Sequence, residues 1–177
     1  MSTSLVVTVI GADRPGIVNL LSDAAQRQAA NWAGSHMASL AGQFAGIVHF
    51  EVAPERADAL VHALRALETM GLQVLLVRSD ASAAPDARRR IRLELVGHDR
   101  PGIVRDLSGS LAERGVSIDE LHTEVVSAAM SAEHLFKCKA LLAVPESLAE
   151  HELQRALETL ANEMMIDIEV APASLGG

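Results

Sequence analysis

Aromatic residues are almost missing from this chain of 177 residues: they make up 2% of it, and there is no tyrosine. Any hydrophobic core must therefore be built from aliphatic side chains, which are abundant because hydrophobic residues reach 49%. Such cores bury less area per residue than aromatic ones, and small domains of this kind gain stability by associating. We expect a homodimer.

Cysteine and long hydrophobic runs are also scarce. Cys138 is the only cysteine, which excludes an intramolecular disulfide and favours a reducing compartment. The apolar run LVVTVI at residues 5–10 has no basic residue before it and is too short for a signal peptide or a membrane span. We therefore expect a cytoplasmic protein with no membrane partner.

Positive charge is in the minority, because the formal net charge is −8. An acidic surface repels phosphate backbones, so we expect no direct contact with nucleic acid. The one basic stretch lacks the aromatic residues that stack on bases, and we interpret it as the solvated end of a linker. This stretch consists of Arg88, Arg89, Arg90 and Arg92.

One eight-residue phrase occurs twice, as GADRPGIV from residue 11 and as GHDRPGIV from residue 97, which are 86 residues apart. Each copy follows a strand-like run and precedes apolar residues at helical spacing, so we interpret it as a strand-to-helix corner. Proline is tolerated in a first helical turn, and Asp13 and Asp99 stand where a carboxylate could cap free amide groups.

The strands that lead into the two corners differ in pattern. The run at 5–10 is continuous, which predicts a strand buried on both faces or nearly so. Its counterpart IRLELV at 91–96 alternates between apolar and polar residues, which predicts one exposed face.

Both halves then continue in the same order, strand, strand, helix, strand. The complete β-α-β-β-α-β order is that of the ferredoxin-like α+β fold, in which an antiparallel sheet carries both helices on one face. The other face needs a cover, from the sister domain or from a second chain. We predict two tandem domains at 1–79 and 91–177, joined by a polar linker at 80–90 and with a longer hairpin loop at 127–133 in the second.

The D-R-P-G phrase at the first strand-to-helix corner, within this order of elements, resembles the ACT domain family of small regulatory modules. The resemblance covers residues 5–78 and 91–170. The tandem arrangement and the opening GADRPGIVN are most similar to ACT transcriptional repressors that act through a protein contact without touching DNA. The resemblance implies a transcriptional activator of the LysR type as the partner, and glycine or serine as the effector.

The corner has the chemistry to bind an amino acid. Main-chain N–H groups at a helix start lack partners and attract a carboxylate, and a glycine there lets a ligand approach closely. Asp13 or Asp99 could supply the charge that an ammonium group needs. The candidate ligand-binding residues are Asp13, Arg14, Pro15, Gly16, Ile17, Asn31 and His36 in the first repeat, and Asp99, Arg100, Pro101, Gly102 and Ile103 in the second.

Two of these candidates lie on the second strand of the first repeat. Asn31 is included because the resemblance implies an asparagine at the start of that strand in ACT domains that bind amino acids. The second repeat has Ser117 there, so we do not expect equal binding at the two sites. His36 matches His122, but no metal-ligand cluster accompanies either, and a structural or interface role is preferred over a metal site.

No catalytic motif is found. Cys138 lies between two lysines, which could lower its pKa, but it has no partner for nucleophilic catalysis, and we interpret it as a packed thiol. ACT domains also precede catalytic domains, as in formyltetrahydrofolate deformylases, whereas this sequence ends after the second repeat. We expect a protein that is not an enzyme and uses no cofactor or metal. The alternative is a structural interaction module that binds no metabolite, in which the corner serves only folding.

Overall fold

The computed structural model describes residues 2–79, 88–127 and 133–173. The chain divides into an N-terminal unit, Met1–Ala84, and a C-terminal unit, Pro85–Gly177. Residues 80–87 of the expected linker and 128–132 of the expected hairpin loop lie outside the described residues. In the described part of the chain, no helix is both long enough and apolar enough to cross a membrane.

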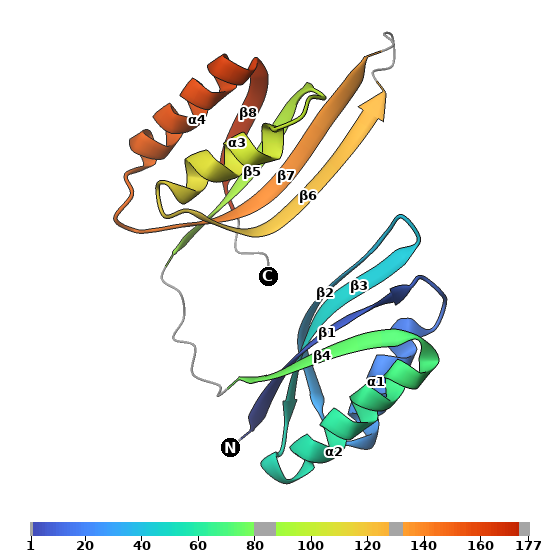
Figure 1. Ribbon diagram of the computed structural model, residues 1–177. Helices are drawn as coiled ribbons and strands as arrows, with labels where there is room; N and C mark the ends of the chain where they lie inside the picture. The colour runs from blue at the N-terminus through green and yellow to red at the C-terminus, as the bar shows by residue number, and fades with distance from the viewer. Residues whose placement is uncertain (1, 80–87, 128–132, 174–177) are drawn as a thin grey trace. The chain divides into compact units, whose positions relative to one another are not determined.

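The N-terminal unit is one antiparallel sheet of four strands in the order β2-β3-β1-β4, with two helices on one of its faces (Figure 1). A short 3-10 helix, η1, continues directly from the second helix. The elements are β1 (Thr3–Ala12), α1 (Ile17–Arg27), β2 (Asn31–Leu40), β3 (Gln43–Val52), α2 (Pro54–Arg65), η1 (Ala66–Met70) and β4 (Leu72–Ser79).

The C-terminal unit repeats this topology, with the strand order β6-β7-β5-β8 and α3 and α4 on one face (Figure 1). The prediction of two tandem ferredoxin-like domains is therefore confirmed. One helix, α4, replaces the pair of α2 and η1. The elements are β5 (Arg89–His98), α3 (Ile103–Ala112), β6 (Ser117–Ser127), β7 (His134–Val144), α4 (Glu150–Met164) and β8 (Ile166–Pro172).

The core of each unit lies between its sheet and its helices. In β1 the side chains of Leu5, Val7 and Val9 are fully buried against α1 and α2, while Ile10 is 42% exposed. The expectation that β1 is buried on both faces is therefore wrong within the unit, because the helices cover only one side of the sheet. The alternation predicted for the counterpart strand β5 is confirmed, with Leu93 and Leu95 fully buried and their neighbours exposed.

The basic stretch at residues 88–92 is not the solvated end of a linker, because most of it lies within β5. The strand begins at Arg89, and the guanidinium of this residue donates a 2.9 Å hydrogen bond to the carbonyl oxygen of Leu148. The Nε atom of Arg90 lies 2.9 Å from Oδ2 of Asp119 in an ion pair. These arginines therefore belong to the sheet of the C-terminal unit and to its contacts.

Candidate functional site

The first candidate site is the corner between β1 and α1. Gly16 has φ 94° and ψ −4°, the left-handed conformation that a type II turn requires at its third residue, and Pro15 before it suits the second position. The helix begins at Ile17, and its first hydrogen bond runs from the N–H of Leu20 to the carbonyl of Gly16 at 3.0 Å. The amide groups of the first helical turn therefore have no acceptor within the helix.

Within the described residues, this turn is open on the side where the glycine lacks a side chain. A Cβ atom built on Gly16 would have no heavy atom within 4 Å. Among the described residues, no side chain caps α1, so the expected capping by Asp13 is wrong. Asp13 is exposed, and its main-chain N–H donates a 2.9 Å hydrogen bond to the carbonyl of Gly42 in the β2–β3 turn. The corner thus leaves the main-chain donors of α1 uncapped and carries an exposed aspartate three residues before Gly16.

The second corner has the same backbone but a different neighbour. Gly102 has φ 98° and ψ −10°, α3 begins at the next residue, and Asp99 bonds through its N–H to the carbonyl of His134 at 2.9 Å. As in the first repeat, no described side chain caps the helix. However, the Oδ2 atom of Asp106 lies 3.8 Å from where a Cβ of Gly102 would be. A second carboxylate therefore lies beside these donors, where the first repeat has Leu20.

The glycine that opens each phrase is required by packing between strands. A Cβ on Gly11 would approach a side-chain carbon of Leu72 to 2.8 Å, and one on Gly97 would approach Cγ2 of Ile166 to 2.3 Å. Two further members of the motif are also structural, because Ile17 and Ile103 are 2% exposed and belong to the cores. These features position the corner, and the motif residues between them are exposed.

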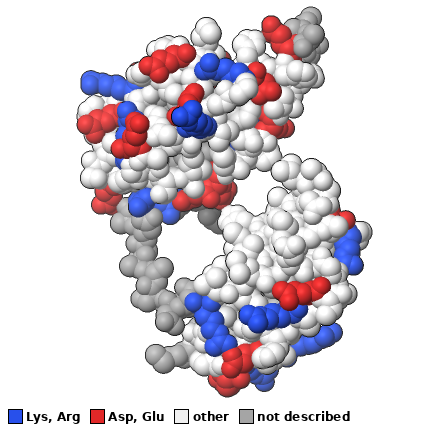
Figure 2. Space-filling model, viewed as in Figure 1, with Lys and Arg blue, Asp and Glu red and all other residues white. Residues whose placement is uncertain are grey.

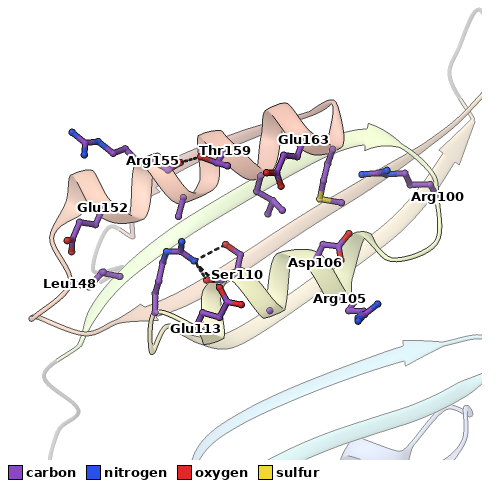
Figure 3. Close-up of a pocket in the computed structure, with 15 residues that line it drawn as sticks. Arg100, Arg105, Asp106, Ser110, Glu113, Leu148, Glu152, Arg155, Thr159 and Glu163 are labelled. Atoms are coloured by element: carbon purple, nitrogen blue, oxygen red, sulfur yellow. Dashed lines mark hydrogen bonds and ion pairs between the residues drawn. The ribbon is translucent and has the colours of Figure 1, made fainter.

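The motif arginines do different things in the two units. Arg14 donates a 2.6 Å hydrogen bond from Nη2 to the carbonyl of Met70, the last residue of η1. Arg100 instead lines a groove of about 1160 Å³ between α3 and α4, and within the described residues its guanidinium makes no hydrogen bond or ion pair. Figure 3 shows Arg100, Asp106 and Glu163 at one end of this groove. The groove exists where α3 presents the small residues Gly109 and Ser110 to α4.

The structure does not bring the second-strand candidates to the corner. Asn31 pairs with Glu51, which pairs with Ser4 at the start of β1, whereas Asp13 follows the end of β1. At about 3.4 Å per residue, the two candidates are separated by about 30 Å along the sheet. Ser117 has the same place in its own sheet, and its Oγ accepts a 2.7 Å hydrogen bond from Arg88.

The matching histidines are also remote from the corners. His36 pairs with Ile47 in the middle of β2, and His122 pairs with Lys139 in β6, so both lie on the sheet face opposite the helices. Over residues 2–79, 88–127 and 133–173, no group of three or more histidine, cysteine or acidic side chains could bind a metal ion. The two histidines are therefore surface residues of two edge strands.

Cys138 is a packed thiol, as the sequence predicts. Its side chain is 2% exposed in the core under α3 and α4, and burial raises its pKa. The expectation that lysines could lower the pKa is wrong because Lys137 and Lys139 point to the opposite face of β7 and are exposed. Such a thiol is a poor nucleophile at neutral pH.

Sequence reasoning missed two parts of the corner region. One is Asp106, and its signal was available: shifting the first repeat by 86 residues aligns this carboxylate with Leu20. The other is the contact between Arg14 and the carbonyl of Met70, which no pattern predicts because any residue carries such a carbonyl.

The chain matches one known family over both units. The sequence model of the ACT domain matches residues 3–76 and 90–171. A crystal structure of an unknown protein from Galdieria sulphuraria has a TM-score of 0.82 and 33% identity, with 98% of this chain and 99% of that one covered. No curated protein sequence matches the chain.

A second solved structure is similar over both units as well. It is the crystal structure of a protein proposed to be a glycine cleavage system transcriptional repressor. Its TM-score is 0.70 at 17% identity, and the alignment covers 97% of each chain. At this identity the match shows a common fold.

Proposed function

The chain belongs to the ACT domain family, and we propose that it is a regulatory protein without catalytic activity whose N-terminal corner binds a small amino acid. Binding would change how the protein contacts a transcriptional regulator. The observation that carries this proposal is the open turn at Gly16, where the amide groups of α1 are uncapped and the exposed Asp13 precedes the glycine by three residues. The amide groups suit the α-carboxylate of an amino acid, and the aspartate suits its ammonium group.

The N-terminal corner is the better site of the two. The carboxylate of Asp106 lies 3.8 Å from the Cβ position of Gly102, so it repels an anionic group placed against the donors of α3. The N-terminal corner has the uncharged Leu20 at the corresponding position. We therefore expect one strong site per chain, and a weaker one or none in the C-terminal unit.

The size of the ligand limits its affinity. Glycine has five heavy atoms, and the best small ligands gain about 1.5 kcal/mol per atom, so the binding free energy cannot exceed about 7.5 kcal/mol. This corresponds to a Kd of a few micromolar at the tightest, and a range up to millimolar is realistic. Such an affinity suits a sensor of a metabolite pool.

Asn31 and Asp13 of one copy cannot contact the same ligand. A molecule of five heavy atoms cannot span about 30 Å of sheet, so one ligand cannot contact Asn31 and Asp13 of the same unit. Because both residues belong to the N-terminal unit, they must come from two copies of the chain if they bind the same amino acid. This requirement agrees with the homodimer that we propose.

The partner is proposed from the resemblance in sequence and fold. The net charge of −8 supports a protein contact over a DNA contact, and the solved structure of similar fold is a protein proposed to be a glycine cleavage system repressor. We propose that this chain restrains an activator of the LysR type in the cytoplasm and that glycine or serine weakens the contact. His36 stays a candidate only for that contact, because it is remote from the corner.

Isothermal titration calorimetry of the full chain tests ligand binding. Glycine and serine should bind, whereas acetate and methylamine, which each carry half of the zwitterion, should bind more weakly. Gly16→Ala and Gly102→Ala form a matched pair because both glycines have nearly the same backbone angles. Only Gly16→Ala should abolish the heat. Folded protein that shows no heat with any amino acid at millimolar concentration would remove the sensor.

The alternative is a structural module whose corner serves folding alone. Two observations favour it: Arg14 is bonded to the carbonyl of Met70, and Ile17 belongs to the core. This reading predicts that the affinity for a purified LysR-type activator is the same with and without glycine. A decrease in that affinity with glycine, lost in Gly16→Ala, would support the regulator instead.

A further inference from the structure

The sheet face that α1 and α2 leave open carries no charged side chain across its middle, from Val6 to Ile10 on β1 and from Ala45 to His49 on β3. The central row across the sheet consists of Ile47, Thr8 and Leu75, which are paired in register on adjacent strands. Ile47 is 52% exposed and Leu75 is 65% exposed, so these apolar side chains meet solvent. Neighbouring members of this open face are Val6, Ile10, His36, Ala38, Ala45, His49 and Val77, whereas the charged Glu51 and the polar Gln43 and Gln73 lie toward its ends. In Figure 2 the surface over β2 and β3 is white.

The C-terminal unit has charged residues at the same sheet positions. Its corresponding row, again in register, consists of Lys139, Glu94 and Glu169, and the first two form an ion pair at 3.8 Å. Arg92 stands where the N-terminal sheet has Val6. The same fold therefore forms with a charged open face, so the apolar side chains of the N-terminal face are not needed to form the sheet.

An exposed sheet face with an apolar, uncharged centre is typical of an interaction surface. Large exposed apolar patches on soluble proteins mark places where another molecule packs. The charged face of the C-terminal unit is a poor match, because Arg92, Glu94 and Glu169 would lose water against side chains that offer no charge in return. The best match for the apolar centre of this face is another apolar sheet face. A second copy of the chain supplies one, because it has the same N-terminal sheet.

We propose that two copies of the chain associate through their N-terminal sheets, open face against open face, about a two-fold axis. Such a contact is self-complementary and uses both apolar faces, so it closes at a dimer. Four strands of eight residues cover about 500 Å² of flat area, and two faces together reach the roughly 1,000 Å² that a specific interface needs. Sheets packed in this way lie about 10 Å apart. This interface does not depend on the amino-acid site.

Sedimentation velocity of the full chain without amino acids tests the interface. The native chain should be a dimer at micromolar concentration, and Leu75→Asp should weaken the dimer at least 100-fold. Glu169→Lys changes the charge at the corresponding position of the C-terminal sheet and should leave the dimer intact. Circular dichroism checks that each variant is folded, and the milder Leu75→Ser replaces Leu75→Asp if the latter unfolds.

Three results would overturn the proposal. A native chain that is monomeric would mean that no second copy covers the face. A folded Leu75→Asp or Leu75→Ser variant that dimerises as tightly as the native chain would place the interface elsewhere. Dissociation caused equally by Glu169→Lys would show that the C-terminal sheet takes part. None of these results bears on the calorimetry of amino-acid binding, so the two proposals fail separately.

Discussion

The guanidinium of Arg14 donates a 2.6 Å hydrogen bond to the main-chain carbonyl of Met70. These residues are distant in sequence, but the bond joins the corner after β1 to the end of η1. The carbonyl at the end of a helix carries partial negative charge, so a cation is favoured there. In the C-terminal unit α4 continues to Met164, and Arg100 lines the groove beside it. The same motif residue thus stabilises one unit and lines an open surface in the other.

The first prediction follows from this bond. Arg14→Met should lower the free energy of unfolding of the N-terminal unit by about 1 kcal/mol, the usual net value of one hydrogen bond, because the bond is exposed to solvent. Urea unfolding followed by the fluorescence of Trp32, the only tryptophan, reports this unit. Arg56→Met is the control, since the exposed side chain of this arginine in α2 makes no hydrogen bond or ion pair among the described residues. Equal effects of the two changes would contradict the prediction.

The order and type of the elements could be predicted because the two halves repeat the same periods. The second strand of the first repeat is expected to start at Asn31, and β2 does begin there (Asn31–Leu40). The cap of α1 could not be predicted in the same way. Asp13 is a common cap type, but the Pro15-Gly16 turn places a left-handed glycine at the cap position, and the aspartate lies three residues before it.

The separation of Asn31 from the corner could have been inferred from topology. In a β-α-β-β order with antiparallel neighbours, the helix returns along the sheet, so the second strand starts at the end opposite to the first corner. Resemblance to a family gives the residue types of a site but does not say whether they come from one copy. The pKa of Cys138 could not be predicted from its neighbours for a similar reason. Lys137 and Lys139 are adjacent to it in sequence, but successive side chains of a strand point to opposite faces, so the lysines do not contact the thiol.

Glycine substitutions in the C-terminal unit should have opposite effects on its stability. Gly97→Ala would place a Cβ 2.3 Å from Cγ2 of Ile166, and such overpacking costs about 1–3 kcal/mol. Gly109→Ala meets no atom within 4 Å on an exposed position of α3, so better helix propensity should stabilise by about 0.5–1 kcal/mol. Urea unfolding followed by circular dichroism measures both, and the Trp32 transition of the other unit should not move. A neutral Gly97→Ala would show that β5 and β8 can separate freely.

The pKa of Cys138 predicts how stability depends on pH. Burial raises the pKa of this thiol in the folded state, so the unfolded chain releases the proton first as the pH rises. The stability is unaffected below the ordinary thiol pKa of about 8.5 and decreases above it. In Cys138→Ala the free energy of unfolding should decrease less above this pH, because the thiol is gone. The variant is less stable at every pH, because removing the sulfur leaves a cavity in the core. Parallel pH profiles of the two proteins would disprove the buried-thiol explanation.

The carboxylate of Asp106 should act on ligand binding and on stability in opposite directions. It lies in the first turn of α3, where a negative charge stabilises the helix, so Asp106→Asn should lower the free energy of unfolding by about 0.5 kcal/mol. The same change removes the negative charge beside Gly102 without changing the shape of the side chain, and a carboxylate can then approach the amide groups. Calorimetry with glycine should therefore find a second site per chain in Asp106→Asn.

The matched variant Asp167→Asn removes a charge of the same unit on the open face of β8 and should leave the stoichiometry of glycine binding unchanged. A loss of stability without a second site would mean that the C-terminal corner serves folding alone, whereas the sensor role of Gly16 would still be decided by its own titration.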